Sequence, residues 1–235
     1  MGRAFEFRKA RKMKRWDAMA KAFTRLGREI AMSVKENGPD PATNSRLRTA
    51  IQNAKGVNMP KDRIDSAIKR ASSKDEKDFQ EVVYEGYGPY GVAILVECAT
   101  DNPVRTVASI RKYFSWSGGA LGKTGSLDFI FERKGVFKFK ADGQNIEDLE
   151  LDLIDSGADE IFEHEGEIFV YTKFADFGTM QKALEERNIE VISAELQRIP
   201  NSAADVKEEQ EEEILSLIDK FEEDDDVQAV YHNMK

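Results

Sequence analysis

Residues 135–172 read GVFKFKADGQNIEDLELDLIDSGADEIFEHEGEIFVYT, and this stretch decides the fold of the second half of the chain. Short runs rich in β-branched and aromatic residues predict strands, whereas apolar residues three or four positions apart predict helices. With the residues that follow, the predicted elements are a strand at 135–140, a helix at 146–156, strands at 159–163 and 167–172, a helix at 174–187 and a strand at 190–199. The order βαββαβ is that of a ferredoxin-like unit.

The segments on either side of this unit complement each other. Before it, strands are predicted at 81–84, 91–99 and 126–132, with a helix at 102–116. After Pro200, the sequence predicts an acidic helix containing Ile214 and Phe221, and a final strand containing Val227. A lone helix and strand cannot bury a core, so we expect them to join residues 79–133, with the ferredoxin-like unit inserted between the two segments.

The first 78 residues predict a small all-helical domain. Trp16, Met19, Phe23, Leu26 and Ile30 recur at steps of three and four, which is the apolar stripe of a helix over residues 13–34. Two further helices are predicted, one through Leu47 and Ala54 and one opened by Pro60. The predicted fold class is therefore α+β and multidomain. Its parts are a basic helical domain (1–78), a discontinuous acidic α/β domain (79–133 with 200–235) and a ferredoxin-like α/β domain (134–199).

Charge separates the first of these domains from the others. Residues 1–78 hold 20 Lys and Arg against 10 Asp and Glu, or +10, while residues 79–235 hold 15 against 34, or −19, which together give the net −9. A basic module can bind a polyanion even when the rest of the chain is acidic. The sequence therefore predicts that the N-terminal domain binds nucleic-acid phosphates.

Ten cations are predicted to make these contacts. On a helical wheel Lys14, Lys21, Arg25 and Arg28 gather opposite the apolar stripe of the first helix. The full predicted set is Arg8, Lys9, Lys14, Lys21, Arg25, Arg28, Arg46, Arg48, Lys55 and Lys61. Lys123, in a glycine-rich loop, is predicted to make a minor phosphate contact.

Motifs of enzymes fail on closer inspection. Gly86, Gly88 and Gly91 have the G-x-G-x-x-G spacing, but a strand follows them where a dinucleotide site needs a helix. The loop before Lys123 is one residue short of a P-loop, because Ser117 stands where the first glycine is required. The two histidines and the single cysteine, Cys98, lack the companions of a metal site. We therefore expect no catalytic residue, no metal ligand set and no cofactor.

Cys98 also bears on localisation, since one cysteine permits no disulfide within the chain and suits a reducing compartment. The longest apolar runs fall far short of the roughly 20 residues that span a bilayer, and the basic N-terminus has no apolar block behind it. The sequence predicts a cytoplasmic protein with no membrane partner.

Several motifs, in order, resemble the YebC/PmpR family over nearly the whole chain. The matching stretches are FTRL (23–26), REI (28–30), DP (40–41), RLR (46–48), NMPKD (58–62), YEGYGP (84–89), TDN (100–102), RT (105–106), FERKG (131–135), DVQ (226–228) and VYHN (230–233). The resemblance implies three domains and a cytoplasmic protein without enzymatic activity. It also implies a regulator of gene expression, since some members are described as DNA-binding transcriptional regulators and others as translation factors that act on ribosomes.

The chain departs from the family pattern at two places. Members open with Gly-His-Ser-Lys-Trp, whereas residues 2–6 here are Gly-Arg-Ala-Phe-Glu, and Ala120 stands where asparagine is expected. The positive charge of the N-terminus survives the first change. The sequence thus leaves three functions open: a DNA-binding transcriptional regulator, a factor that binds ribosomal RNA and regulates translation, and a scaffold whose acidic domains bind a protein partner.

Overall fold

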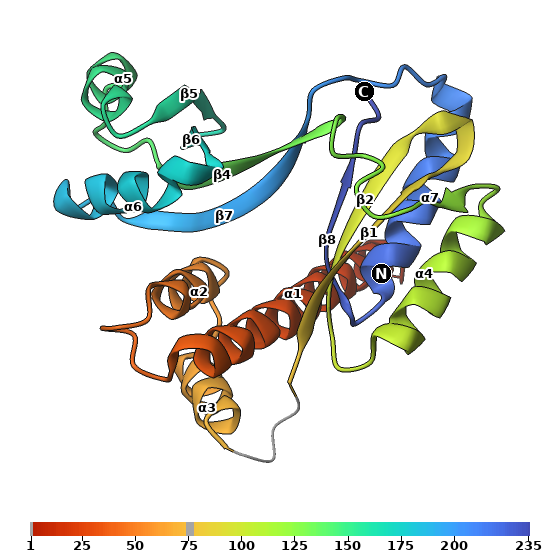
Figure 1. The fold of residues 1–235 in the computed structure, drawn as a ribbon, viewed down its shortest axis with the longest axis horizontal. Coiled ribbons are helices and arrows are strands. Elements are labelled where there is room, and N and C mark those ends of the chain that lie inside the picture. The colour runs from red at the N-terminus through yellow and green to blue at the C-terminus, as the bar shows by residue number, and fades with distance from the viewer. Residues whose placement is uncertain (1, 74–77) are drawn as a thin grey trace. The chain divides into compact units, whose positions relative to one another are not determined.

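The computed structural model of the chain describes residues 2–73 and 78–235, with side chains from residue 18 onward. The chain divides into two compact units, residues 1–79 and 80–235. The first unit is helical and the second contains two sheets (Figure 1). The α+β class predicted from the sequence is confirmed.

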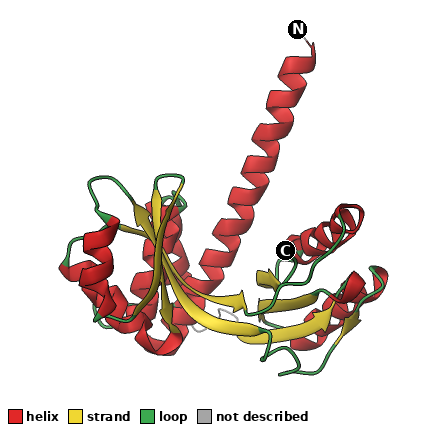
Figure 2. Ribbon diagram, turned by 90° about the horizontal axis from the view of Figure 1, so that it is seen from above, coloured by secondary structure: helices red, strands yellow, loops and turns green. Residues whose placement is uncertain are grey.

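Three helices form the first unit: α1 (Gly2–Asn37), α2 (Ser45–Gly56) and α3 (Lys61–Ala71). Their common core contains Ile30, Leu47 and Ile64, with Phe23 and Leu26 packed against it. Helix α1 has 36 residues, or about 54 Å at 1.5 Å per residue. Figure 2 shows it as one unbroken helix. Helix α1 begins at Gly2, earlier than the start at residue 13 that the apolar stripe predicted. Its first part therefore precedes the residues of α1 on which α2 and α3 pack.

The second unit begins with an antiparallel sheet in the order β3-β1-β2-β8. Its strands are β1 (Gln80–Tyr87), β2 (Ala93–Thr100), β3 (Ala120–Leu121) and β8 (Val227–His232). Helices α4 (Pro103–Trp116) and α7 (Glu208–Glu223) cover one face (Figure 1). Phe114 of α4 and Phe221 of α7 meet there, with ring centroids 4.8 Å apart. The last strand, β8, pairs with β2, as expected for a segment that returns to the earlier one.

The opposite face of this sheet is covered by a turn rather than by a strand. Leu127, Ile130 and Phe131 pack on Ala93 and Leu95 of β2. The prediction of a strand over residues 126–132 was therefore wrong for residues 126–130, which form turns, and right only for Phe131 and Glu132, where the next strand begins. The side chains of these apolar residues are buried against the sheet, but their backbone does not pair with its edge strand.

The second sheet has the order β5-β6-β4-β7, with all neighbours antiparallel. Its strands are β4 (Phe131–Lys140), β5 (Ala158–His164), β6 (Glu167–Lys173) and β7 (Val191–Pro200). Helices α5 (Ile146–Ile154) and α6 (Phe177–Glu186) lie against one face, where Leu153, Leu184 and Phe137 are buried (Figure 1). A short 3₁₀ turn, Phe174–Asp176, precedes α6, so that helix starts later than predicted. Because both sheets are antiparallel, the predicted description of these parts as α/β is corrected to α+β.

Candidate nucleic-acid interface

A buried asparagine fixes the geometry of the three-helix unit. Asn44 is the N-cap of α2, and its side-chain oxygen accepts a hydrogen bond from the Leu47 amide at 3.0 Å. Its amide nitrogen donates to the carbonyl of Ser33 at 2.7 Å and to that of Gly38 at 2.8 Å. One side chain therefore joins the end of α1 to the start of α2, which sets how the surface cations of the two helices are arranged.

Two of the predicted binding cations, Arg46 and Arg48, form contacts within the helical unit. The Arg46 Nε lies 2.9 Å from Glu29 Oε1, and its Nη1 lies 2.9 Å from Glu36 Oε2. Arg48 Nη1 donates to the carbonyls of Pro41 and Ala42 at 2.8 and 3.1 Å. These guanidinium groups are placed by contacts within the unit, where they tie α2 to α1 and to the loop before it.

The remaining described cations of the set lie on two helix faces. Lys21, Arg25 and Arg28 are half-buried along α1, and the Arg28 guanidinium stands over the Phe79 ring at 5.1 Å from its centroid. Lys55 and Lys61 are exposed on the two sides of the turn between α2 and α3. Within the part of the chain whose side chains are described, Lys21, Lys55 and Lys61 form no ion pair.

Three predicted residues fall outside the described side chains. Arg8, Lys9 and Lys14 belong to the first half of α1, whose backbone is helical.

Helix α3 carries exposed cations that the sequence-based set omitted. Lys69 and Arg70 are exposed in its last turn, and the Arg63 guanidinium lies 5.4 Å from the centroid of the Phe23 ring. Asp62 and Asp65 stand on the same helix. The exposure of these cations could have been predicted from the sequence. In KDRIDSAIKRA the apolar Ile64 and Ala67 are buried on one face of the helix, and the charged residues are left on the other.

The loop that carries Lys123 is held by a buried carboxylate. Glu85 is 4% exposed and accepts hydrogen bonds from the amides of Gly125 and Leu127, at 2.8 and 2.7 Å. Gly119 must be glycine, since a Cβ there would lie 2.4 Å from the Tyr87 carbonyl oxygen. Lys123 itself is exposed. The loop is thus a fixed turn after α4, not a phosphate cradle before a helix.

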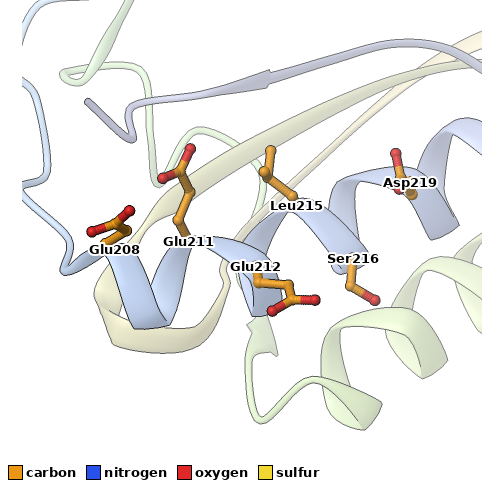
Figure 3. A pocket seen from close by; sticks show the side chains of 6 residues that line it. All are labelled: Glu208, Glu211, Glu212, Leu215, Ser216 and Asp219. Atoms are coloured by element: carbon orange, nitrogen blue, oxygen red, sulfur yellow. The ribbon is translucent and has the colours of Figure 1, made fainter.

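The exposed face of α7 is acidic. A hollow of about 400 Å³ lies along it, lined by Glu208, Glu211, Glu212, Leu215, Ser216 and Asp219. Figure 3 shows these side chains spread along one helix rather than converging on a point. Four carboxylates in this arrangement repel a polyanion, so the hollow is no phosphate site.

Among the described residues, no group of three or more His, Cys, Asp or Glu side chains is placed to hold a metal ion. Cys98 is buried in the first sheet. No helix in the described part of the chain combines the length and the apolar character needed to cross a bilayer.

Comparison with known proteins decides the family. A family model described as the TACO1/YebC protein N-terminal domain matches residues 3–74, and one described as the TACO1/YebC second and third domain matches residues 79–234. The chain belongs to the TACO1/YebC family. The resemblance seen in the sequence motifs is thereby confirmed.

TACO1/YebC relatives extend over the full chain. A protein of Cytophaga hutchinsonii is 67% identical over 234 residues, covering 100% of this chain and 98% of its own length. One of Flavobacterium johnsoniae is 54% identical over 235 residues, covering 100% and 99%. Both are named "Probable transcriptional regulatory protein". The names describe regulators, and the TACO1/YebC family is non-enzymatic.

A solved TACO1/YebC-like structure supports the fold. The crystal structure of a conserved hypothetical protein from Aquifex aeolicus matches with a TM-score of 0.81 and 36% identity. The match covers 92% of this chain and 90% of the other.

Proposed function

We propose that this protein is a non-enzymatic regulator of gene expression that docks its three-helix unit on nucleic-acid phosphates, with DNA as the main target. The observation that carries the proposal is the +10 charge of residues 1–78 beside a −19 remainder. Lys and Arg that neutralise phosphates release counterions, which supplies affinity without base contacts. The name of the Cytophaga and Flavobacterium relatives, probable transcriptional regulatory protein, supports the same function.

The contacts within the helical unit support a smaller set of residues as direct phosphate contacts. Arg46 and Arg48 hold the unit together, so their role in binding is to position the surface. Lys21, Lys55 and Lys61, which form no ion pair with a described residue, are proposed as direct contacts together with Arg25 and Arg28. Arg8, Lys9 and Lys14 extend the proposed contact along α1.

A second candidate target, ribosomal RNA, is favoured by the composition of α3. Direct reading of DNA bases uses Asn, Gln and bidentate Arg at the major groove. Helix α3 instead presents Lys61, Arg63, Lys69 and Arg70 among aspartates. Such a surface contacts backbone and shape, which is how double-stranded RNA is recognised. In this alternative the protein regulates translation on the ribosome.

The pairing of the strands supports a proposal for the domain organisation of residues 79–235. We propose that residues 134–199 form a ferredoxin-like unit inserted into an acidic domain made of residues 79–133 and 200–235. The strand order β5-β6-β4-β7 supports the first part, and the pairing of β8 with β2 supports the second. The acidic surfaces would repel nucleic acid and leave room for a protein partner. We place the protein in the cytoplasm, in keeping with its single buried cysteine.

The test is a charge reversal, Lys55→Glu with Lys61→Glu, compared with the unmodified protein. Gel shifts with duplex DNA and sucrose-gradient sedimentation of lysates, each at two salt concentrations, separate the two targets. Loss of a selective, salt-sensitive shift in the variant supports DNA regulation, and loss of comigration with ribosomes supports the translational alternative. Unchanged behaviour in both assays would refute both and favour a scaffold that works through its acidic domains.

A further inference from the structure

Helix α4 and the loop after it are an exception within the acidic unit. Residues 102–127 hold four cations, Arg105, Arg111, Lys112 and Lys123, and no Asp or Glu. The whole of residues 79–235 carries −19. This run of 26 residues therefore carries +4 within a unit whose net charge is −19, which favours contact with a polyanion at this place.

The cations of this run have different roles. Arg105 is used internally, because its Nη2 lies 2.7 Å from Asp226 Oδ2 and 3.0 Å from Asp101 Oδ1. Arg111 and Lys112 are exposed nearly two helical turns further on and form no ion pair with a described carboxylate. Lys123 is likewise exposed. The end of α4 thus presents positive charge to solvent.

An exposed tryptophan accompanies that charge. Trp116, the last residue of α4, is 63% exposed, and the Lys112 Nζ lies 4.1 Å from its ring centroid. A large aromatic side chain left in water at a helix end does not contribute to a core. An indole beside an ammonium group can stack an unpaired base while nearby cations contact the flanking phosphates.

The loop after Trp116 is held in a single shape. The Gly119 amide donates to the Phe114 carbonyl at 2.9 Å, and the Gly122 amide donates to the Glu85 carbonyl at 2.7 Å. Strand β3 lies at the sheet edge beside the end of α4 (Figure 1). A surface fixed by such contacts loses little entropy on binding, which favours affinity.

We infer that the end of α4, with Trp116, Arg111, Lys112 and Lys123, is a second nucleic-acid contact that binds an unpaired base and its flanking phosphates in a single-stranded segment. The inference rests on the proposed function, nucleic-acid binding, and gives it a second surface outside the three-helix unit. The helical unit binds the phosphate backbone, and the α4 end selects strands with unstacked bases.

The experiment measures binding of the full chain to short fluorescein-labelled oligo(rA), oligo(dA) and a random duplex by anisotropy. Trp116→Ala is expected to weaken binding of the single strands roughly 5- to 150-fold, the range for loss of one stacked base. Trp116→Phe, which keeps a ring, is expected to recover most of it. Equal losses for RNA and DNA mean that the sugar is not read, and a larger loss for RNA means that it is; both support the site.

A matched control removes another exposed aromatic residue of the same unit. Phe129 is 73% exposed and follows Asp128, outside the run of residues 102–127. Phe129→Ala is expected to leave single-strand binding unchanged within about twofold, as for surface substitutions generally. If Trp116→Ala and Phe129→Ala behave alike, the α4 site is refuted.

A spectroscopic readout checks the stacking itself. The chain has two tryptophans, Trp16 and Trp116, so Trp16→Phe leaves Trp116 as the single reporter. Titration with oligo(rA) is expected to quench its fluorescence, and unchanged emission under saturating oligonucleotide would contradict stacking. Arg111→Gln with Lys112→Gln should also lower the slope of log affinity against log salt by about 1.4, or 0.7 per phosphate contact.

The binding results of the two variants distinguish failure of the α4 site from failure of the proposed interface on the three-helix unit. If Lys55→Glu with Lys61→Glu weakens duplex binding while Trp116→Ala changes nothing, the helical interface stands and the α4 site falls. If the charge reversal changes nothing while Trp116→Ala weakens single-strand binding, the α4 site stands alone.

Discussion

The two units use their dominant charges in the same two ways, although the charges have opposite signs. In the helical unit Arg46 and Arg48 form ion pairs and hydrogen bonds within the unit, while Lys55 and Lys61 are exposed to solvent. In the sheet unit, Glu85 and Asp226 are buried and bonded, while the carboxylates of α7 line an open face. The formal net charge of each unit therefore overstates the charge that a binding partner meets, because charged groups paired within the unit do not contribute to it.

The largest effect is expected where a buried carboxylate is removed from the sheet unit. Asp226 is 5% exposed and accepts hydrogen bonds from Thr100, Thr106 and Arg105 at 3.1, 2.8 and 2.7 Å. Asp226→Ala should lower the free energy of unfolding by about 3–5 kcal/mol, the usual cost of breaking a buried charged network. Urea denaturation followed by circular dichroism measures it, and a loss below about 1 kcal/mol would show that the network is not stabilising.

A comparable polar residue in the helical unit should have a smaller effect. Asn44→Ala removes an N-cap, worth about 0.5–2 kcal/mol, and leaves the Ser33 carbonyl without this donor, at about 1–3 kcal/mol. We expect a loss of about 2–4 kcal/mol in the unfolding of the helices. In thermal unfolding of the full chain, the variant should shift the helical transition and leave that of the sheets in place. A common shift of both transitions would mean that the units unfold as one.

Substitution of Arg46, which is paired within the unit, and of Lys61, which forms no ion pair with a described residue, distinguishes cations that stabilise the fold from cations that bind phosphate. The Arg46 side chain is 33% exposed, so solvent screens its pairs and Arg46→Met should cost only about 0.5–1 kcal/mol. Lys61→Met should leave stability unchanged within about 0.5 kcal/mol. Duplex binding should respond in the opposite order, with the salt slope lower by about 0.9 for Lys61→Met. A larger binding loss for Arg46→Met would show that its guanidinium reaches phosphate after all.

The smallest expected effect is a pH dependence from His232 of β8. Burial lowers the pKa of its imidazole below the ordinary value of about 6.5, because the buried site disfavours the charged ring. The unfolded state then binds the proton more readily, so the contribution of His232 to stability is present above about pH 6.5 and is lost as the pH falls through the folded pKa. His232→Gln should flatten the dependence of urea midpoints between about pH 7.5 and 5. A curve parallel to that of the unmodified protein would contradict this assignment.

The sequence predicted the helices and strands wherever periodicity was strong. The stripes of α1 and α7 and the order of elements from β4 to β7 were visible, because each element buries one face of regular spacing. Residues 126–130 were mistaken for part of a strand, since an apolar run that packs across a sheet has the composition of one that pairs with it. Its turn depends on Glu85, some 40 residues away in sequence, which no local pattern reveals.

Less of the candidate interface was predictable. Charge counting predicted that the interface lies on the helical unit, but the partners of Arg46, on another helix, depend on how α1 and α2 pack. The α4 end was also missed: Trp116 and Lys112 are four residues apart and so share a helix face, yet only the fold shows that this face is exposed.

The most direct test of the central claim is titration of duplex DNA and of purified ribosomes with the unmodified protein and with Lys55→Glu, Lys61→Glu, at several salt concentrations. We predict that the unmodified protein binds at least one of the two with a steep salt dependence, and that the variant loses affinity and shows a shallower slope. Equal affinity and equal slope in the two proteins would contradict a nucleic-acid interface on the three-helix unit.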